Sequence, residues 1–303
     1  ECPGISGPIV DIVKKLDKSV DLVVSGHTHK AYKCEIDGRL VTSGDKFGTV
    51  VTQIDLKIDR KSRDVIEAKA DNVIVRTDAF AKDPEQTALI AAYEKVAGPL
   101  IERPVGKIAA TLAKAEAPSG EIPLGNLIAD AQLSVTRAAD KGAAVIAVTN
   151  PGGIRADLPK KTEDGSVTYG DIFAVQPFSN NLVTLTMTGE QIDLMLEQQW
   201  IDQPKPRILQ VSKTFGYTWD DKKPVGERVD IASITIDGKP IDPKAEYRVT
   251  VNNFLADGGD GFKVFRKTTK HLPGIFDVDA LEEYLKTAGV VEAPALGRIV
   301  KAN

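Results

Sequence analysis

Two histidines one residue apart are the clearest candidates for chemistry in this chain. His27 and His29 lie in the segment Ser25-Gly26-His27-Thr28-His29, directly after the apolar run Leu22-Val23-Val24. Imidazole nitrogens on a loop that leaves a strand suit borderline divalent metals such as zinc or manganese. The chain has three histidines in all. Finding two at this spacing therefore favours metal ligation over a turn with two exposed histidines.

Two imidazoles do not complete a catalytic centre of two metals, which needs several further nitrogen and oxygen ligands. Only residues 1–26 precede His27, and the chain begins with Glu1 rather than methionine. We therefore expect this chain to be the later part of a longer protein, or a processed piece of one, with the other ligands on the missing part.

A second candidate site is the segment 150–155, which follows an apolar strand. Gly152 and Gly153 allow backbone amides to approach an anion, and the planar guanidinium of Arg155 suits a phosphate or carboxylate. The segment matches neither a Walker loop nor a dinucleotide fingerprint. Taken alone, a tight turn with a surface arginine explains it equally well.

Aromatic side chains beside polar groups mark two further loops. In the segment 252–262, Phe254 precedes Asp260 by six residues, with glycines between them. An aromatic face and a carboxylate suit a nucleoside, whose base stacks and whose ribose hydroxyls donate hydrogen bonds. The segment 176–181 places Phe178 beside amide side chains, and the two rings could sandwich a base. The alternative is two phenylalanines of the core.

Charge and composition limit the classes of partner that this chain can bind, and its two cysteines bear on the cellular compartment. A net charge of −4 and a pI near 5.6 give no general attraction to a nucleic acid polymer or an anionic membrane. No apolar stretch is long enough to span a membrane. Cys2 and Cys34 flank the two histidines, and they are either a structural disulfide of an exported protein or two separate buried thiols.

The hydrophobic pattern predicts a chain of mixed elements. A helix is expected at 7–18, a buried strand at 22–24, β-hairpins over 31–75, and a helix at 83–102 that could link two domains. The elements expected after residue 104 are strands at 105–112, 144–149, 182–187 and 247–252, a hairpin at 233–241, and helices at 121–140, 190–200 and 279–286. This alternation predicts an α/β or α+β fold.

In this order, the four motifs resemble the 5′-nucleotidase family of the metallophosphoesterase superfamily, which also includes 2′,3′-cyclic-nucleotide phosphodiesterases. The resemblance covers almost the whole chain, including the segment Leu124-Gly125-Asn126-Leu127-Ile128-Ala129-Asp130-Ala131. It implies that residues 1–76 are the C-terminal remnant of a metallophosphoesterase β-sandwich domain. Residues 77–103 would be a linker helix, and residues 104–303 an α/β substrate-binding domain.

The resemblance also implies roles for individual residues. The metal ligands would be His27 and His29, and the base would lie between Phe178 and Phe254 with help from Asn180. Asp260 would hold the ribose hydroxyls. The phosphate and ribose side would be contacted from the loop that contains Asn150, Gly152, Gly153 and Arg155.

The activity implied is that of an exported nucleotide phosphohydrolase with two divalent metal ions, zinc, manganese or similar. The intact parent would be the enzyme, and this chain alone is expected to be inactive, because the earlier ligand motifs and the catalytic Asn-His pair of the family are absent from it. Its partners would be a nucleotide or nucleoside and the missing N-terminal part. The alternative is a nucleotide-binding module or processed fragment without catalysis.

Members of the family often carry an arginine where this chain has Ala117-Pro118-Ser119-Gly120. This difference leaves the preferred phosphate ester open.

Overall fold

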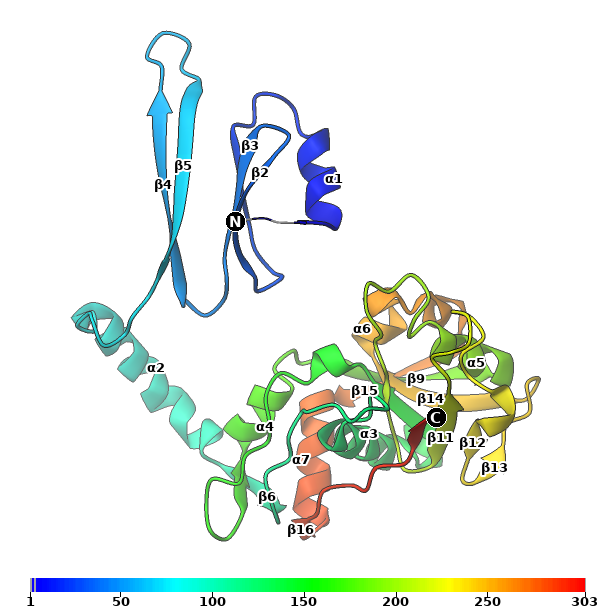
Figure 1. Ribbon diagram of the computed structural model, residues 1–303. Helices are drawn as coiled ribbons and strands as arrows, with labels where there is room; N and C mark the ends of the chain where they lie inside the picture. The colour runs from blue at the N-terminus through cyan, green and yellow to red at the C-terminus, as the bar shows by residue number, and fades with distance from the viewer. Residues whose placement is uncertain (1, 3, 303) are drawn as a thin grey trace. The chain divides into compact units, whose positions relative to one another are not determined.

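The computed structural model describes residue 2 and residues 4–302, and it shows a mixed α/β chain (Figure 1). The mixed class predicted from the sequence is confirmed. Contacts divide the chain into two compact units, residues 1–91 and 92–303, and the division falls inside helix α2 (Pro84–Ile101). Within the described part of the chain, no helix is both long and apolar enough to cross a membrane.

The first unit pairs a short helix with a three-stranded sheet. Helix α1 spans Pro8–Lys15, and the sheet has the order β1-β3-β2, in which β1 and β3 are parallel. The strands are β1 (Leu22–Ser25), β2 (Ala31–Ile36) and β3 (Arg39–Gly44). Val13 of the helix is fully buried in a small core with Cys34 and Val41 of the sheet. β1 was predicted to be buried, but it is only partly so, because its Val24 side chain is exposed.

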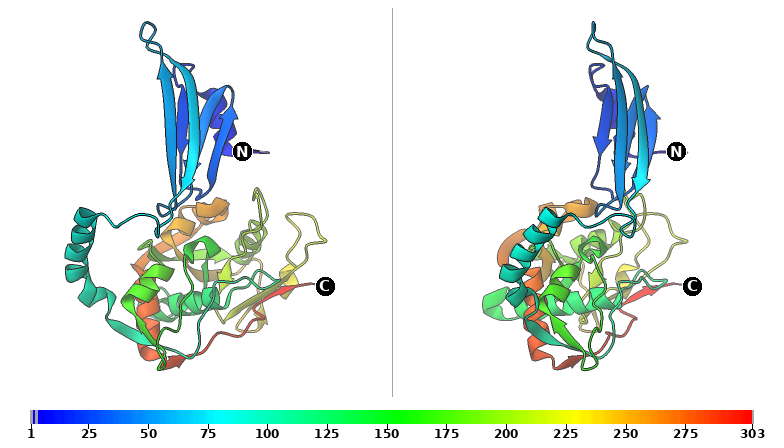
Figure 2. Two further views of the ribbon diagram at one scale, coloured as in Figure 1. Left: turned by 60° about the vertical axis from the view of Figure 1, so that its left-hand side comes forward. Right: turned by 90° about the vertical axis from the view of Figure 1, so that its left-hand side faces the viewer.

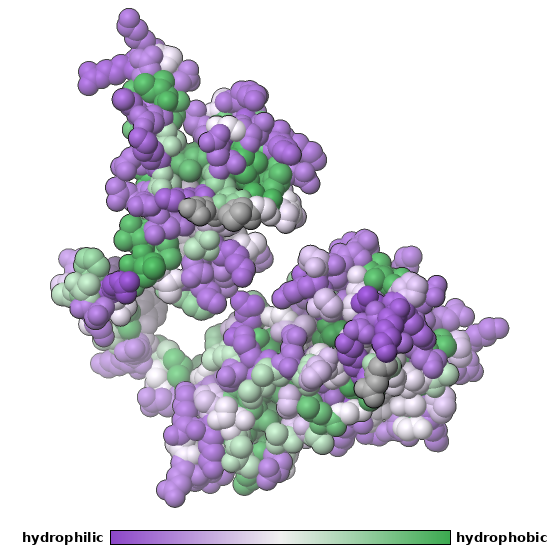
Figure 3. Space-filling model, viewed as in Figure 1, coloured by the Kyte–Doolittle hydropathy of each residue, from purple (hydrophilic) through white to green (hydrophobic). Residues whose placement is uncertain are grey.

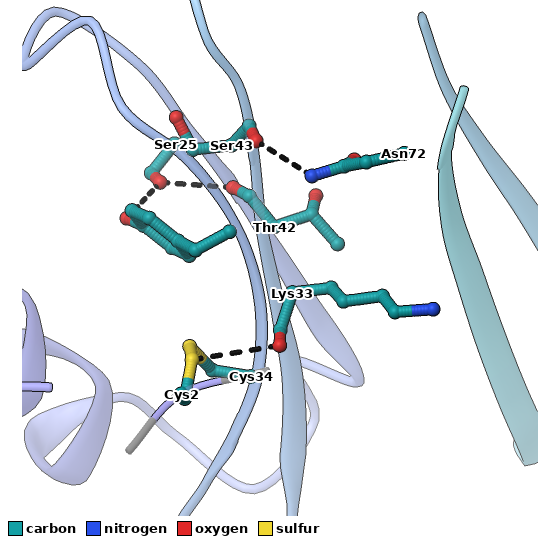
Figure 4. Close-up of a disulfide and its surroundings, with 8 residues drawn as sticks. Cys2, Ser25, Lys33, Cys34, Thr42, Ser43 and Asn72 are labelled. Carbon is teal, nitrogen blue, oxygen red and sulfur yellow. Dashed lines mark hydrogen bonds between the residues drawn. A yellow bond between two sulfur atoms is a disulfide. The ribbon is translucent and has the colours of Figure 1, made fainter. Parts of the chain in front are cut away.

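A long hairpin completes this unit. β4 (Val50–Ile58) and β5 (Val65–Ile74) are antiparallel, with Val50 opposite Ile74 (Figures 1 and 2). The side-chain amide of Asn72 on β5 donates to the backbone carbonyl of Ser43 on β3, 3.2 Å away, which ties the hairpin to the sheet (Figure 4). Leu56, Ile58 and Ile66 remain exposed, and hydrophobic surface is visible along the hairpin in Figure 3.

The second unit is built on a five-stranded sheet of order β10-β7-β14-β9-β15, with two smaller sheets of order β13-β12-β11-β17 and β16-β6-β8 (Figure 1). Among the described residues, its remaining α-helices are α3 (Pro123–Thr136), α4 (Tyr169–Val175), α5 (Gly189–Glu197), α6 (Asn253–Ala256) and α7 (Asp277–Thr287). The strands are β6 (Pro104–Ile108), β7 (Ile146–Thr149), β8 (Ser166–Thr168), β9 (Asn181–Thr188), β10 (Gln210–Val211), β11 (Phe215–Trp219), β12 (Thr235–Ile236), β13 (Lys239–Pro240), β14 (Glu246–Asn252), β15 (Thr269–Phe276), β16 (Val290–Val291) and β17 (Ile299–Lys301).

The two faces of the central sheet differ because side chains alternate along each strand. On β14, Val249 and Val251 lie in the largest apolar core, which also includes residues of α5. Thr250, between them, faces the other way. Its hydroxyl lies 2.7 Å from that of Thr136 on α3 and 3.0 Å from that of Thr184 on β9. Small hydroxyl side chains thus pair with α3, and bulky apolar ones form the core on the opposite face.

Most predicted elements are confirmed within a few residues, and the exceptions have local causes. The strand predicted at 105–112 ends at Ile108, and Leu112 forms only an isolated bridge with Leu158. β15 was not predicted, because it contains Pro273 and Gly274 and all of its residues are exposed at the edge of the sheet.

A disulfide joins Cys2 to Cys34, so the alternative of two separate thiols is wrong (Figure 4). The two Cα atoms are 5.3 Å apart. The bond fixes the segment before α1 to strand β2, and it uses both cysteines of the chain.

Replacing both cysteines by serine is expected to destabilise the first unit by about 3 to 4 kcal/mol, because the bond closes a loop with a sequence separation of 32 residues. Hydrogen exchange of the β1–β3 amides measures the loss. Amides of the central sheet in the second unit are the internal control and should exchange as before. Unchanged protection in β1–β3 would contradict the prediction.

Candidate functional site

One edge of the central sheet gathers chain segments from all five strands. β7 and β14 are parallel, so both carboxyl ends lie at this edge. The antiparallel neighbours reach it with their opposite ends: Leu182 at the start of β9 pairs with Asn252, and Gln210 at the start of β10 pairs with Thr149. β15 ends there at Phe276. Ligands of open α/β sheets bind at such an edge.

A buried hydrogen-bond network joins the loops that follow β7 and β14. Asn150 is 4% exposed. Its Nδ2 donates to Oδ2 of Asp260 over 2.8 Å, and its Oδ1 accepts from Nδ2 of Asn252 over 3.1 Å. Oδ1 of Asn252 accepts from the backbone amide of Leu255 and so caps α6. The other carboxylate oxygen of Asp260 pairs with Arg207. The network fixes the position of Asp260.

Phe254 lies on α6, two residues after the capping residue Asn252, and its side chain is 43% exposed. Gly259 packs against its ring. A Cβ atom at Gly259 would lie 2.5 Å from a ring carbon, so this position excludes any larger residue. The next residue, Asp260, adopts a left-handed φ of 54°. The glycine contact and the turn thus place the ring and the carboxylate in one compact loop.

Arg155 and Phe178 form a second pair. The backbone amide of Arg155 donates to the carbonyl of Val175 over 2.9 Å, which places the arginine beside the end of α4. Its guanidinium carbon lies 5.5 Å from the ring centroid of Phe178, and its Nη1 lies 3.4 Å from the carbonyl oxygen of Gly152. Phe178 is 52% exposed. Within the described chain, no carboxylate lies within 4.0 Å of the guanidinium. Its charge is therefore available to an anion.

Asn180 contacts a residue that the sequence did not indicate. Its Nδ2 donates to Oδ2 of Asp277 over 3.2 Å, and its carbonyl accepts from the backbone amide of Asp277 over 2.8 Å. Asp277 begins α7 and is 3% exposed. Burial raises the pKa of its carboxyl group to about 6, against the lowering effect of the Asn180 hydrogen bond.

The structure brings most of the predicted residues of the second unit into one connected set. Asn150 contacts Asp260, whose loop also holds Phe254, and a Cβ atom at Gly152 or Gly153 would touch Asn150. Arg155 and Phe178 join this set through the carbonyl of Gly152. Asn180 lies at the same edge of the sheet, but the structure records no direct contact between Asn180 and these connected residues.

Sequence reasoning missed four residues at this edge: Asn252, Gln203, Arg207 and Asp277. Asn252 could have been found, because it ends an apolar strand directly before the short turn that leads to Asp260, where a capping side chain is expected. Gln203, whose Nε2 donates to the carbonyl of Asp260 over 2.7 Å, lies in an irregular segment with Arg207 and has no pattern that marks it.

The two histidines lie on the loop after β1 in the first unit. Both have left-handed backbone angles, with φ of 69° at His27 and 53° at His29, which is unusual for residues other than glycine. The ring of His29 lies 5.8 Å from that of Phe47, and neither imidazole hydrogen-bonds to another described residue. The ring nitrogens of both histidines are therefore free of partners among the described residues, and two such nitrogens are the kind of donor that zinc or manganese takes. Across residue 2 and residues 4–302, no group of three or more His, Cys, Asp or Glu side chains is placed to hold a metal ion.

Comparisons with known proteins fit this arrangement. Residues 104–267 match the family model described as the 5′-nucleotidase C-terminal domain. The chain is 32% identical to the endonuclease YhcR of Bacillus subtilis, covering 94% of this chain and 22% of that protein. It is 29% identical to the cell wall protein Lmo0130 of Listeria monocytogenes, covering 95% of this chain and 37% of that protein. This chain thus spans well under half the length of both relatives.

A solved structure is also similar. The 5′-nucleotidase precursor from Thermus thermophilus aligns with a TM-score of 0.68 and 29% identity, over 93% of this chain and 59% of that one. The alignment extends across both units, whereas the family model covers only the second.

Replacing Asn150 by alanine is expected to lower the unfolding free energy of the second unit by about 1 to 3 kcal/mol, because the buried amide of Asn252 loses its acceptor. Urea denaturation followed by tryptophan fluorescence measures the unfolding free energy of this unit, because Trp200 and Trp219 both belong to it. Asn181→Ala is the matched control: its side chain is exposed, and the loss should stay below about 0.5 kcal/mol. Equal losses in the two variants would contradict the prediction.

Proposed function

Since the chain belongs to the 5′-nucleotidase C-terminal domain family, we propose that its second unit binds the nucleoside part of a nucleotide. In the intact protein this unit serves a metal-dependent hydrolase of nucleotide phosphoesters, of the 5′-nucleotidase or 2′,3′-cyclic-nucleotide phosphodiesterase type. The observation that carries the proposal is the series of contacts that joins Asp260 to Arg155 through Asn150 and Gly152. The exposed ring of Phe178 lies against Arg155, and the exposed ring of Phe254 lies in the loop of Asp260.

The side chains have complementary tasks. Two exposed aromatic rings offer stacking surface to any base, which favours affinity over selectivity. Asp260 is held by Asn150 and Arg207, so its lone pairs meet ribose hydroxyls without a loss of side-chain freedom. Arg155 has no carboxylate partner within the described residues and supplies positive charge for the phosphate side of the ligand. The fixed loops thus bind a nucleotide by stacking, hydrogen bonding and charge.

His27 and His29 are proposed as two of the ligands of a centre of two divalent ions, zinc, manganese or similar. When bound, such a centre lowers the pKa of a water molecule and neutralises phosphoryl charge. The histidines' contribution is to hold metal through ring nitrogens that have no other described partner. Their left-handed backbone fits a segment whose shape is set by ligation rather than by local preference.

The disulfide supports a proposal about location. A disulfide between Cys2 and Cys34 persists in an oxidising compartment. Together with the likeness to a cell wall protein, it supports export of the intact protein to the periplasm, the cell surface or the medium.

A second candidate function is nucleotide binding without catalysis by the piece described here. It is favoured by the histidine pair, which has no third His, Cys, Asp or Glu placed with it among the described residues. Calorimetry of the chain with adenosine, combined with a phosphate-release assay on adenosine monophosphate, separates the two. Binding without turnover by the chain, and turnover by the longer parent, supports the main proposal. Binding without turnover by both supports the module.

Replacing Phe254 or Phe178 by alanine is expected to weaken adenosine binding by roughly 5- to 150-fold, because stacking on one ring contributes about 1 to 3 kcal/mol. Isothermal titration calorimetry measures the affinity. The control is Phe80→Ala, which removes an exposed ring of the first unit and should leave the affinity unchanged. Unchanged binding with reduced thermal stability would mean that the two rings have only a structural role.

In the intact protein, His27→Ala or His29→Ala is expected to lower phosphate release from nucleotides by about 100-fold or more, because loss of a direct ligand costs at least as much as loss of the groups that orient it. The bound manganese or zinc, measured by elemental analysis, should fall in parallel. His271→Ala removes the only other histidine of the chain and serves as the control. Full metal content in the His27 and His29 variants would contradict the assignment of these histidines as metal ligands.

A further inference from the structure

Asp277 is a deeply buried carboxylate in direct contact with a proposed ligand-binding side chain. It begins α7, and its Oδ1 accepts from the backbone amide of Val278 over 2.9 Å. Its Oδ2 accepts from Nδ2 of Asn180 over 3.2 Å. The backbone amide of Asp277 also donates to the carbonyl of Asn180, so side chain and main chain hold the same partner.

A carboxylate accepts hydrogen bonds and does not donate them, whereas a side-chain amide can turn either its oxygen or its nitrogen toward a neighbour. Contact with Asp277 removes that choice for Asn180. The amide nitrogen must face the carboxylate, which leaves the amide oxygen and one N–H for other partners. Asn180 lies two residues after the exposed ring of Phe178 and at the same sheet edge.

We propose that Asp277 is a positioning residue that fixes the orientation of the Asn180 amide, so that the site selects nucleobases with an exocyclic amino group over bases with a carbonyl at the same position. This inference rests on the proposed nucleoside-binding function. An amide held in one orientation offers an acceptor and a donor in a set order, which matches the amino group and adjacent ring nitrogen of adenine. Hypoxanthine places a carbonyl oxygen where adenine has the amino group, and two acceptors then face each other.

Two features support this role for Asp277. The carboxylate lies at the N-terminus of α7, a helix of 11 residues whose dipole favours the charged form. In addition, burial raises the pKa of Asp277 only to about 6, so at a pH of about 8 the group is ionised and acts as an acceptor alone.

The test compares adenosine with inosine at a pH of about 8 by calorimetry, using the 303-residue chain and its variants. The unmodified chain should bind adenosine roughly tenfold more tightly than inosine, in line with the discrimination of one bidentate contact. Asp277→Asn keeps the shape but can donate as well as accept, so both orientations of Asn180 become available. The adenosine-to-inosine ratio should then fall toward one.

Asn181→Ala is the matched control, because it alters the adjacent exposed amide, and it should leave the ratio unchanged. Asp277→Ala provides a second route should Asp277→Asn fail to fold, since it removes the carboxylate that fixes the amide and keeps Asn180. It should also bring the ratio toward one, with thermal unfolding confirming that the variant is folded.

The outcomes are distinct. A ratio unchanged in Asp277→Asn, or in Asp277→Ala where the first variant does not fold, would overturn the role of Asp277 while leaving nucleoside binding intact. Equal binding of both nucleosides by the unmodified chain would do the same. A variant that loses both affinities equally would mean a purely structural carboxylate and would also overturn it. Failure of the unmodified chain to bind either nucleoside would end the proposed function together with this inference.

Discussion

The hydrogen bond from Asn150 to Asp260 is the contact on which the arrangement of the candidate site depends. It joins two loops that are 110 residues apart in the chain, and both partners are largely shielded from water. A polar group shielded in this way is costly without a partner. The two loops therefore have little freedom to separate, and the ring of Phe254 and the charges of Asp260 and Arg155 keep fixed relative positions.

The sheet makes this contact possible. Parallel β7 and β14 bring their carboxyl ends together, and the hydroxyl of Thr250 on β14 allows α3 to pack through its contact with Thr136. The opposite face carries the bulky residues of the largest core. Loops that carry function are well placed on such a scaffold, because the scaffold limits how far they move.

The sequence predicted those parts of the site that obey local rules. Apolar strands followed by glycine and polar residues indicated the loops that contain Asn150 and Asp260, because parallel strands share an edge. The sequence could not indicate Arg207, since it lies in an irregular segment brought to the edge by β10, a strand of two residues. The sequence could not indicate Asp277 for a similar reason. Strand β15, which precedes Asp277, has the composition of an exposed edge strand rather than of a buried strand.

Two buried carboxylates of the second unit, Glu121 and Asp277, differ in the number and kind of groups that donate hydrogen bonds to them. Glu121 is fully buried, and it accepts from the backbone amides of Gly297 and Arg298 and from the side chain of Asn126. With so many donors, most of them main-chain groups, it fastens the segment before β17 and has little capacity left. Asp277 has fewer donors, and one of them is the side chain of Asn180 at the sheet edge that carries the candidate site. A buried carboxylate with that partner constrains the edge of the central sheet rather than its core.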